Sequence, residues 1–113
     1  VAAVREVAAN VTPADATIPL ISNRDGQAIT NGVQILDRMI DQIALPVRWD
    51  LVMKTITDSG TTANIETCPA GTLSAILRRA IPGIVSHPAN SPSDIGALTQ
   101  SDLLNFDLAE AYR

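Results

Sequence analysis

Short apolar runs alternate with longer stretches whose apolar residues recur three or four positions apart, and this alternation constrains the fold more than any other feature of the sequence. Runs of the first kind are typical of strands, and the second spacing is typical of helices. The strand-like segments are residues 18–22, 61–67 and 84–85, and the helix-like segments are residues 1–10, 30–43, 46–60 and 72–79. Strands joined through helices favour parallel pairing. We therefore predict an α/β fold in which short parallel strands are flanked by helices.

Capping and helix-breaking residues indicate where the helices begin and end. Thr30 or Asn31 can cap the second helix, and Pro46 stops that helix and can start the next one. Gly60 can end the third helix in the left-handed conformation. The residues expected to form the buried stripe of the second helix are Val33, Leu36, Ile40 and Ile43, and those of the fourth helix are Leu73, Ile76, Leu77 and Ala80.

The first strand-like run carries a turn signal at its end. Residues 18–22 are rich in strand-forming residues, and Asp25-Gly26 follows them. We expect this run to be a buried strand of the parallel sheet. Residues 61–67 are expected to form a second strand, with Ala63 and Ile65 on one face.

The last part of the chain differs from the rest in charge. Residues 87–113 hold four acidic residues and one basic residue, whereas residues 1–86 are nearly balanced, with eight acidic and seven basic residues. Residues 87–92 are rich in Pro, Ser and Asn, which predicts a loop. Ser91 can start a short helix after it, and Ser101 can cap a last, acidic helix. We therefore predict an α/β segment at residues 1–86 and an acidic loop and helical tail at residues 87–113.

Composition excludes several classes of function. The net charge is −4 and no basic stripe exists, so we expect no nucleic-acid partner. No apolar run approaches the roughly 20 residues of a membrane helix, so we expect no membrane partner. Cys68 is the single cysteine and His87 the single histidine. One cysteine forms no internal disulfide, which favours a reducing, cytoplasmic location, and this pair alone cannot supply a Cys/His zinc site.

The predicted sheet is too small to stand alone. Two or three short parallel strands cannot cover both of their faces and edges. Residues 1–10 also have a helical pattern without an N-cap, as the later turns of a longer helix would. We expect the missing strands to lie outside this chain, and the isolated chain to expose apolar surface and to be dimeric, swapped or poorly soluble.

The residue types suited to catalysis do not form a clear constellation. Cys68 lies where a strand ends and a helix begins, a place that can favour a thiolate, but a small buried residue at a tight turn is the commoner explanation. A Ser86, His87 and Asp94 triad can be drawn, although neighbours in sequence rarely form one. A thiol enzyme that depends on Cys68 remains an alternative.

Two other features allow a binding function. Arg78 and Arg79 end a helix, where cations complement the helix dipole, and they can also contact phosphate or an acidic partner. Trp49 is the lone tryptophan and is expected to anchor packing. A non-catalytic α/β interaction module that uses these arginines and the acidic tail is therefore a second alternative.

Four segments in a fixed order resemble malonyl-CoA:acyl-carrier-protein transacylases, in particular those of bacterial fatty-acid synthesis. The most specific part is the glutamine followed by Pro-Val-Arg-Trp, and the resemblance covers residues 1–95 or so. The segments are Leu-Ile-Ser-Asn-Arg-Asp-Gly at residues 20–26, Leu-Asp-Arg-Met-Ile-Asp-Gln at residues 36–42, Pro-Val-Arg-Trp at residues 46–49 and Glu-Thr-Cys-Pro-Ala-Gly-Thr-Leu at residues 66–73. Polyketide-synthase acyltransferase domains are related, so a piece of such a domain is a further alternative.

The resemblance implies a fold and an activity. Enzymes of this family move malonyl from coenzyme A to acyl carrier protein through a malonyl-serine ester, and their large domain resembles an α/β-hydrolase. Residues 1–86 would then be the C-terminal part of that large domain. The serine, the catalytic histidine and the arginine that binds the malonyl carboxylate would all lie outside this chain. The implied partners are malonyl-CoA, acyl carrier protein and the remainder of the acyltransferase chain, and no cofactor is implied, because the coenzyme A thioester is a substrate.

The resemblance places one part of the catalytic machinery inside the chain. In the family, the glutamine before Pro-Val-Arg-Trp lends its backbone carbonyl to the catalytic histidine, and Gln42 occupies that position. A histidine that acts as a base through one ring nitrogen needs its other N–H held by an acceptor. The role is a main-chain one, so we expect it to depend on where the helix ends. Pro46 helps to set that end, because it disfavours helical geometry at Leu45.

Overall fold

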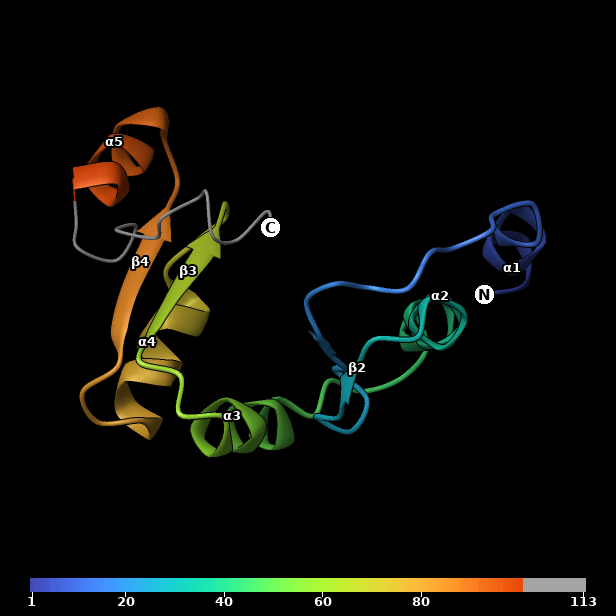
Figure 1. The fold of residues 1–113 in the computed structure, drawn as a ribbon, viewed down its shortest axis with the longest axis horizontal. Coiled ribbons are helices and arrows are strands. Elements are labelled where there is room, and N and C mark those ends of the chain that lie inside the picture. The colour runs from blue at the N-terminus through green and yellow to red at the C-terminus, as the bar shows by residue number, and fades with distance from the viewer. Residues whose placement is uncertain (101–113) are drawn as a thin grey trace. The chain divides into compact units, whose positions relative to one another are not determined.

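The computed structural model describes the backbone of residues 1–100 and the side chains of residues 1–98. The chain divides after Gly60 into two compact units, which are described separately. The first unit contains α1 (Ala2–Ala8), β1 (Leu20–Ile21), β2 (Ala28–Ile29), α2 (Gly32–Gln42) and α3 (Trp49–Asp58), and the second contains β3 (Ala63–Thr67), α4 (Thr72–Ala80), β4 (Val85–Ala89) and α5 (Pro92–Gln100) (Figure 1). The acidic helix expected from Ser101 lies outside the described residues.

Two helix ends predicted for the first unit, at Asn31 and Gly60, are confirmed, whereas α3 begins at Trp49 and not at Pro46 as predicted. The side chain of Asn31 accepts a hydrogen bond from the Gln34 amide at 3.0 Å and caps α2. Gly60 follows α3 with a φ of 70°, in the left-handed region. The sequence predicted these two caps because a cap depends only on residues within one turn of the helix end.

The prediction for the first strand is wrong in its pairing and its burial. β1 pairs with β2 in antiparallel register, Leu20 opposite Ile29 and Ile21 opposite Ala28. Ile18 lies before β1 and is 81% exposed. The Asp25-Gly26 turn explains the difference, since a tight turn brings the next extended segment back beside the first at little cost in loop-closure entropy.

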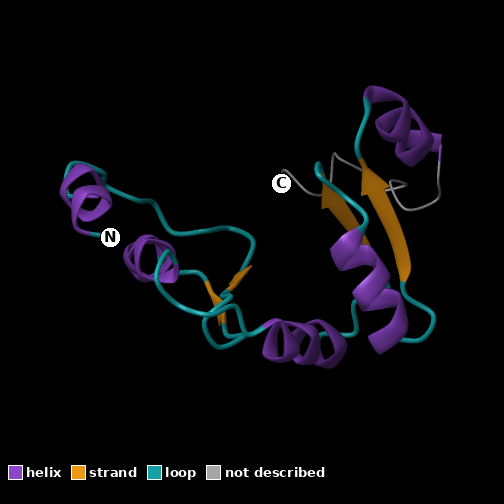
Figure 2. Ribbon diagram, turned by 180° about the vertical axis from the view of Figure 1, so that it is seen from behind, coloured by secondary structure: helices purple, strands orange, loops and turns teal. Residues whose placement is uncertain are grey.

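The second unit confirms the α/β prediction. β3 and β4 pair in parallel, from Ala63 opposite Val85 to Thr67 opposite Ala89, and α4 forms the crossover between them (Figure 2). β4 is longer than predicted, and the loop expected from residue 87 is wrong over residues 87–89. Pro88 is compatible with this strand because β4 has a free side in the two-stranded sheet, where no amide donor is needed. A helix begins at Pro92, as predicted. The division at residue 86 into two parts stays a prediction.

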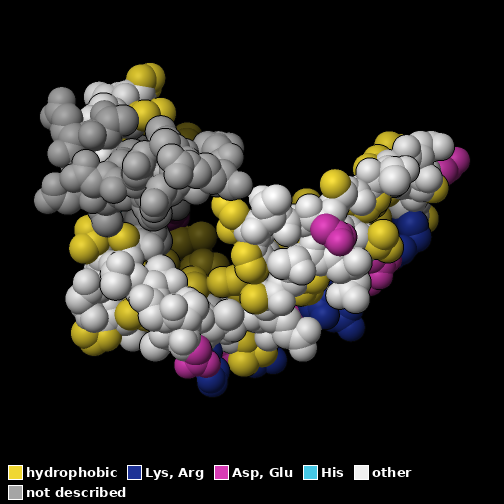
Figure 3. All heavy atoms as spheres, in the orientation of Figure 1, with side chains coloured by type: hydrophobic (Ala, Val, Ile, Leu, Met, Phe, Trp, Pro, Cys, Tyr) yellow, Lys and Arg dark blue, Asp and Glu magenta, His cyan; other side chains and the backbone are white. Residues whose placement is uncertain are grey.

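Much of the apolar surface of these elements has no cover within the described chain. Of the stripe predicted for α2, Ile40 is buried, whereas Val33 and Ile43 are exposed. On α4, Leu77 is buried and Leu73 is 39% exposed. Figure 3 shows apolar side chains at the surface over α1 and α2, beside the charged ones. Within the described chain, no helix combines the length and the apolar character that crossing a membrane requires.

Candidate functional site

The chain turns sharply where α2 ends at Gln42. The backbone carbonyl of Gln42 accepts a hydrogen bond from the Leu45 amide at 3.2 Å. The two preceding bonds of the turn have the same short span, from Ile43 to the Ile40 carbonyl at 3.3 Å and from Ala44 to the Asp41 carbonyl at 3.1 Å. The helix therefore tightens in its last turn before Pro46, as many helices do. A carbonyl oxygen has two lone pairs, so that of Gln42 keeps acceptor capacity beyond this bond.

The side chain of Gln42 turns back onto the same segment. Its amide nitrogen Nε2 lies 3.0 Å from the Leu45 carbonyl oxygen and 3.1 Å from that of Pro46. Leu45 is thus bonded to Gln42 through both its amide and its carbonyl. The main-chain role that the resemblance implies for Gln42 stays a prediction, and the sequence gave no signal for these side-chain contacts.

Two cavities lie beside this turn. One, of about 220 Å³, is lined by Gln42, Arg38 and Met39 of α2 and by residues 20–23. The other, of about 350 Å³, is lined by Val1, Arg24, Asp41, Ala44 and Leu45. Val1 therefore lies close to the residues that flank Gln42, and the N-terminal end is drawn beside α2 in Figures 1 and 2.

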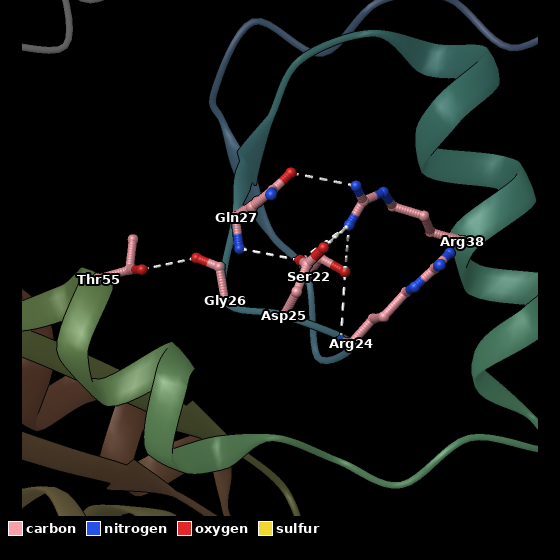
Figure 4. A network of polar contacts seen from close by, with 7 residues as sticks. All are labelled: Ser22, Arg24, Asp25, Gly26, Gln27, Arg38 and Thr55. Carbon is pink, nitrogen blue, oxygen red and sulfur yellow. Dashed lines mark hydrogen bonds and ion pairs between the residues drawn. The ribbon is translucent and has the colours of Figure 1, made fainter.

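A polar network holds the loop that faces α2 (Figure 4). Arg38 Nη1 contacts both carboxylate oxygens of Asp25, at 2.8 and 2.7 Å, and lies 3.3 Å from the Ser22 hydroxyl. Its other nitrogen, Nη2, donates to the Gln27 side chain at 3.2 Å. Burial alone would raise the pKa of Asp25, but Arg38 and the backbone N–H of Gln27 outweigh it and hold that pKa below its usual value. The network joins α2 to the segment that lines the smaller cavity.

The loop is also attached to the segment that follows the turn. The Arg48 amide donates to the Asn23 carbonyl at 2.8 Å, and the Thr55 hydroxyl donates to the Gly26 carbonyl at 2.6 Å. Hydrogen bonds therefore connect residues 22–27 to α2, to Arg48 at the start of α3 and to Thr55 within α3.

Glu66 forms a second polar site, in the second unit. Its carboxylate accepts the amides of Gly71 at 2.8 Å, Leu73 at 3.0 Å and Ser74 at 2.8 Å, where α4 begins. The nearby Ser74 hydroxyl and these amides outweigh burial and lower the pKa of Glu66 to about 2. The Ser74 hydroxyl makes no hydrogen bond in the described structure, so the groups that contact the Glu66 carboxylate directly are the three backbone amides. Glu66 thus anchors the start of α4, a role that the sequence did not reveal.

Comparisons with known proteins show what the chain is similar to. The chain is 42% identical over 91 residues to the malonyl CoA-acyl carrier protein transacylase of Mycobacterium tuberculosis, and 35% identical over 97 residues to that of Mycolicibacterium smegmatis. The crystal structure of MCAT from Mycobacterium tuberculosis superimposes with a TM-score of 0.78 at 40% identity, over 83% of this chain. The Synechocystis transacylase structure gives a TM-score of 0.75 at 25% identity. No family model matches the chain.

The chain matches the C-terminal segment of malonyl-CoA:acyl-carrier-protein transacylases. The resemblance inferred from the four sequence segments is therefore confirmed, and so is the α/β fold class. The chain spans 30% of the length of the Mycobacterium tuberculosis relative and 31% of the chain in its crystal structure.

The remaining candidates for catalysis do not come together as a site. Cys68 is exposed, so the expectation of a buried residue is wrong, and its peptide bond to Pro69 is cis. The Ser86 hydroxyl donates to the Asn64 side chain at 2.5 Å, while Asp94 accepts from Ser91 and the neighbouring amides at the start of α5. No triad with His87 is formed. Among the described residues, no group of three or more His, Cys, Asp or Glu side chains is arranged to hold a metal ion.

The residues considered for binding lie at the surface or are half-buried. Arg78 and Arg79 are exposed in the last turn of α4, as expected for cations at a helix C-terminus. Trp49 begins α3 and is half-buried, and its indole N–H has no hydrogen-bond partner in the described structure. Whether the two arginines contact a partner stays a prediction.

Proposed function

We propose that the chain is part of an enzyme that transfers malonyl from coenzyme A to acyl carrier protein through a malonyl-serine intermediate. The family match and the order of the four motif segments support this activity. The partners are then malonyl-CoA, acyl carrier protein and the upstream part of the enzyme. We also propose that the reaction needs no cofactor beyond the coenzyme A thioester, which is a substrate, and that it takes place in the cytoplasm.

Within that enzyme, the backbone carbonyl of Gln42 accepts the N–H of the catalytic histidine. The histidine takes the serine proton on one ring nitrogen, and its other nitrogen keeps its hydrogen bonded to the carbonyl. An acceptor there stabilises the imidazolium without adding a net charge. The observation that supports this assignment is the cavity that Val1 lines together with Asp41, Ala44 and Leu45, on both sides of Gln42 in the sequence.

The activity is tested by measuring transfer of labelled malonyl from malonyl-CoA to acyl carrier protein. The protein that joins this segment to its upstream portion is expected to catalyse transfer, and the 113-residue chain alone is expected to be inactive. Transfer by the purified 113-residue chain would refute the assignment of serine and histidine to the upstream part. Absence of transfer by the longer, folded protein would refute the proposed activity.

The role of Gln42 is tested by carbon-13 labelling of its carbonyl in the active protein. The chemical shift of this carbonyl is expected to follow the titration of the upstream histidine as the pH changes, because the acceptor senses the charge on its donor. The labelled carbonyl of Val33, in the first turn of α2, is the control and is expected not to follow it. A Gln42 carbonyl that does not respond to the titration would refute the assignment.

A further inference from the structure

The hydrogen bonds between Gln42 and the residues after it run in opposite directions. The Leu45 amide donates to the Gln42 carbonyl at 3.2 Å, while the Gln42 side chain donates to the carbonyls of Leu45 at 3.0 Å and Pro46 at 3.1 Å. Residue 42 therefore contacts its own turn as an acceptor through the main chain and as a donor through the side chain. We propose that the side-chain amide of Gln42 is a positioning group that sets the direction of its own main-chain carbonyl. This inference rests on the proposed function.

The backbone bonds of the turn are no shorter than the side-chain bonds. Those from Ile43, Ala44 and Leu45 measure 3.3, 3.1 and 3.2 Å, in the upper part of the usual range for N–H···O bonds or just beyond it. The two side-chain bonds are as short as the best of them or shorter. Pro46 has no N–H and so cannot add a backbone bond to the turn. The side chain of Gln42 adds two hydrogen bonds to this turn, and one of them is to Pro46, which cannot donate a backbone hydrogen bond itself.

Glutamine suits position 42 because its side chain is long enough to reach the two carbonyl oxygens and has two N–H donors for them. Its amide nitrogen carries two hydrogens, one for each of the two carbonyl oxygens that it contacts. A glutamate of the same shape has no donor when ionised and would bring its charge against two carbonyl oxygens. A methionine has similar length and helix propensity but no donor. A lysine reaches as far and supplies three donors.

The consequence for the reaction is confined to the base. If the carbonyl turns away from the histidine, the imidazolium loses stabilisation and the pKa of the base falls. Proton transfer then becomes less efficient, while the substitution changes none of the groups that bind malonyl-CoA, which the proposed function assigns to the upstream part of the enzyme. We therefore expect a loss in kcat with little change in KM.

The test compares substitutions at position 42 in the active protein that contains this segment. Gln42→Met is expected to lower kcat about tenfold, as the loss of one net hydrogen bond at the transition state would. It is also expected to move the acid limb of the kcat/KM profile to lower pH. Gln42→Lys is expected to recover much of kcat, because it restores the donors. Gln34→Met, in the first turn of the same helix, is the matched control and is expected to match the parent protein.

A second readout does not depend on turnover. Hydrogen exchange at the Leu45 amide is expected to be faster in Gln42→Met than in the parent and in Gln34→Met, because the turn has lost its side-chain bonds. An active parent whose Gln42→Met variant keeps its kcat, its pH profile and its exchange rate would overturn the positioning role and leave the proposed function intact. An inactive parent would overturn both.

Discussion

Arg38 on α2 holds the carboxylate of Asp25 through a single guanidinium nitrogen, which lies 2.8 Å from one oxygen and 2.7 Å from the other. The side chains of this pair are 20% and 30% exposed, so the two charges are partly shielded from water. The pair closes the loop that lines the smaller cavity beside Gln42. Its loss is expected to weaken the first unit as well as the surroundings of the site.

Replacement of Arg38 by methionine is therefore expected to destabilise the protein. Asp25 would keep its position and lose its charged donor, at a cost of about 1–3 kcal/mol in the free energy of unfolding. Denaturation by urea at one fixed protein concentration measures the change. Arg78→Met, at an exposed position of α4, is the matched control and is expected to change stability by less than about 0.5 kcal/mol. Equal effects of the two substitutions would contradict the role given to the network.

The stability of the second unit is expected to depend on acid through Glu66. Its pKa is about 2 in the folded protein, against an ordinary value of 4.5, so the folded state binds fewer protons than the unfolded state between these values. The contribution of Glu66 is fully present above pH 4.5 and is lost as the pH falls toward 2. Thermal unfolding measured from pH 6 downward follows this loss.

Glu66→Gln isolates the effect of that carboxylate. The variant is expected to be less stable near neutral pH. Its unfolding in acid is expected to take up fewer protons than that of the parent, by up to about one. Glu6→Gln, at an exposed position of α1, is expected to keep the acid dependence of the parent. If Glu66→Gln lost stability with acid as steeply as the parent, the Glu66 carboxylate would not be the source of the acid dependence.

Two glycines separate the cost of backbone geometry from the cost of crowding. Gly26 and Gly60 both have positive φ, 71° and 70°, so an alanine at either position is strained by about 1–2 kcal/mol. A Cβ at Gly26 would also lie 2.5 Å from the Leu51 carbonyl oxygen, whereas nothing lies within 4 Å at Gly60. Gly26→Ala is expected to lower the free energy of unfolding by about 1–3 kcal/mol more than Gly60→Ala does, as measured by thermal or urea unfolding. Similar losses for the two variants would mean that the loop can move away from Leu51.

The isolated chain is expected to associate in solution. Val7, Ile18 and Val33 are 72%, 81% and 65% exposed, and each strand of the described structure belongs to a two-stranded sheet. Exposed apolar side chains and unpaired strand edges favour contact between copies. Sedimentation velocity over a range of concentrations is the measurement. A compact monomer at every concentration, with cooperative unfolding, would count against the expectation.

Local signals in the sequence were sufficient for the presence of the helices, for two of their caps and for the crossover. Asn31 and Gly60 act at helix ends through bonds and torsions within a few residues, and the β3–α4–β4 order implies parallel pairing for steric reasons. The order of the motif segments was also sufficient for the resemblance to the transacylases, while the role given to Gln42 stays a prediction. None of these inferences required knowledge of the path of the whole chain.

Contacts between distant residues were decided by the tertiary structure. The sequence did not reveal that β1 would pair with β2, that Arg38 would reach Asp25 and Ser22, or that Val1 and Leu45 would line the same cavity. Each of these depends on where the backbone carries side chains that are far apart in sequence, and no local propensity encodes that position. The exposed stripe of α2 has a related cause, because helical spacing shows which residues can be buried, while burial itself requires a partner surface.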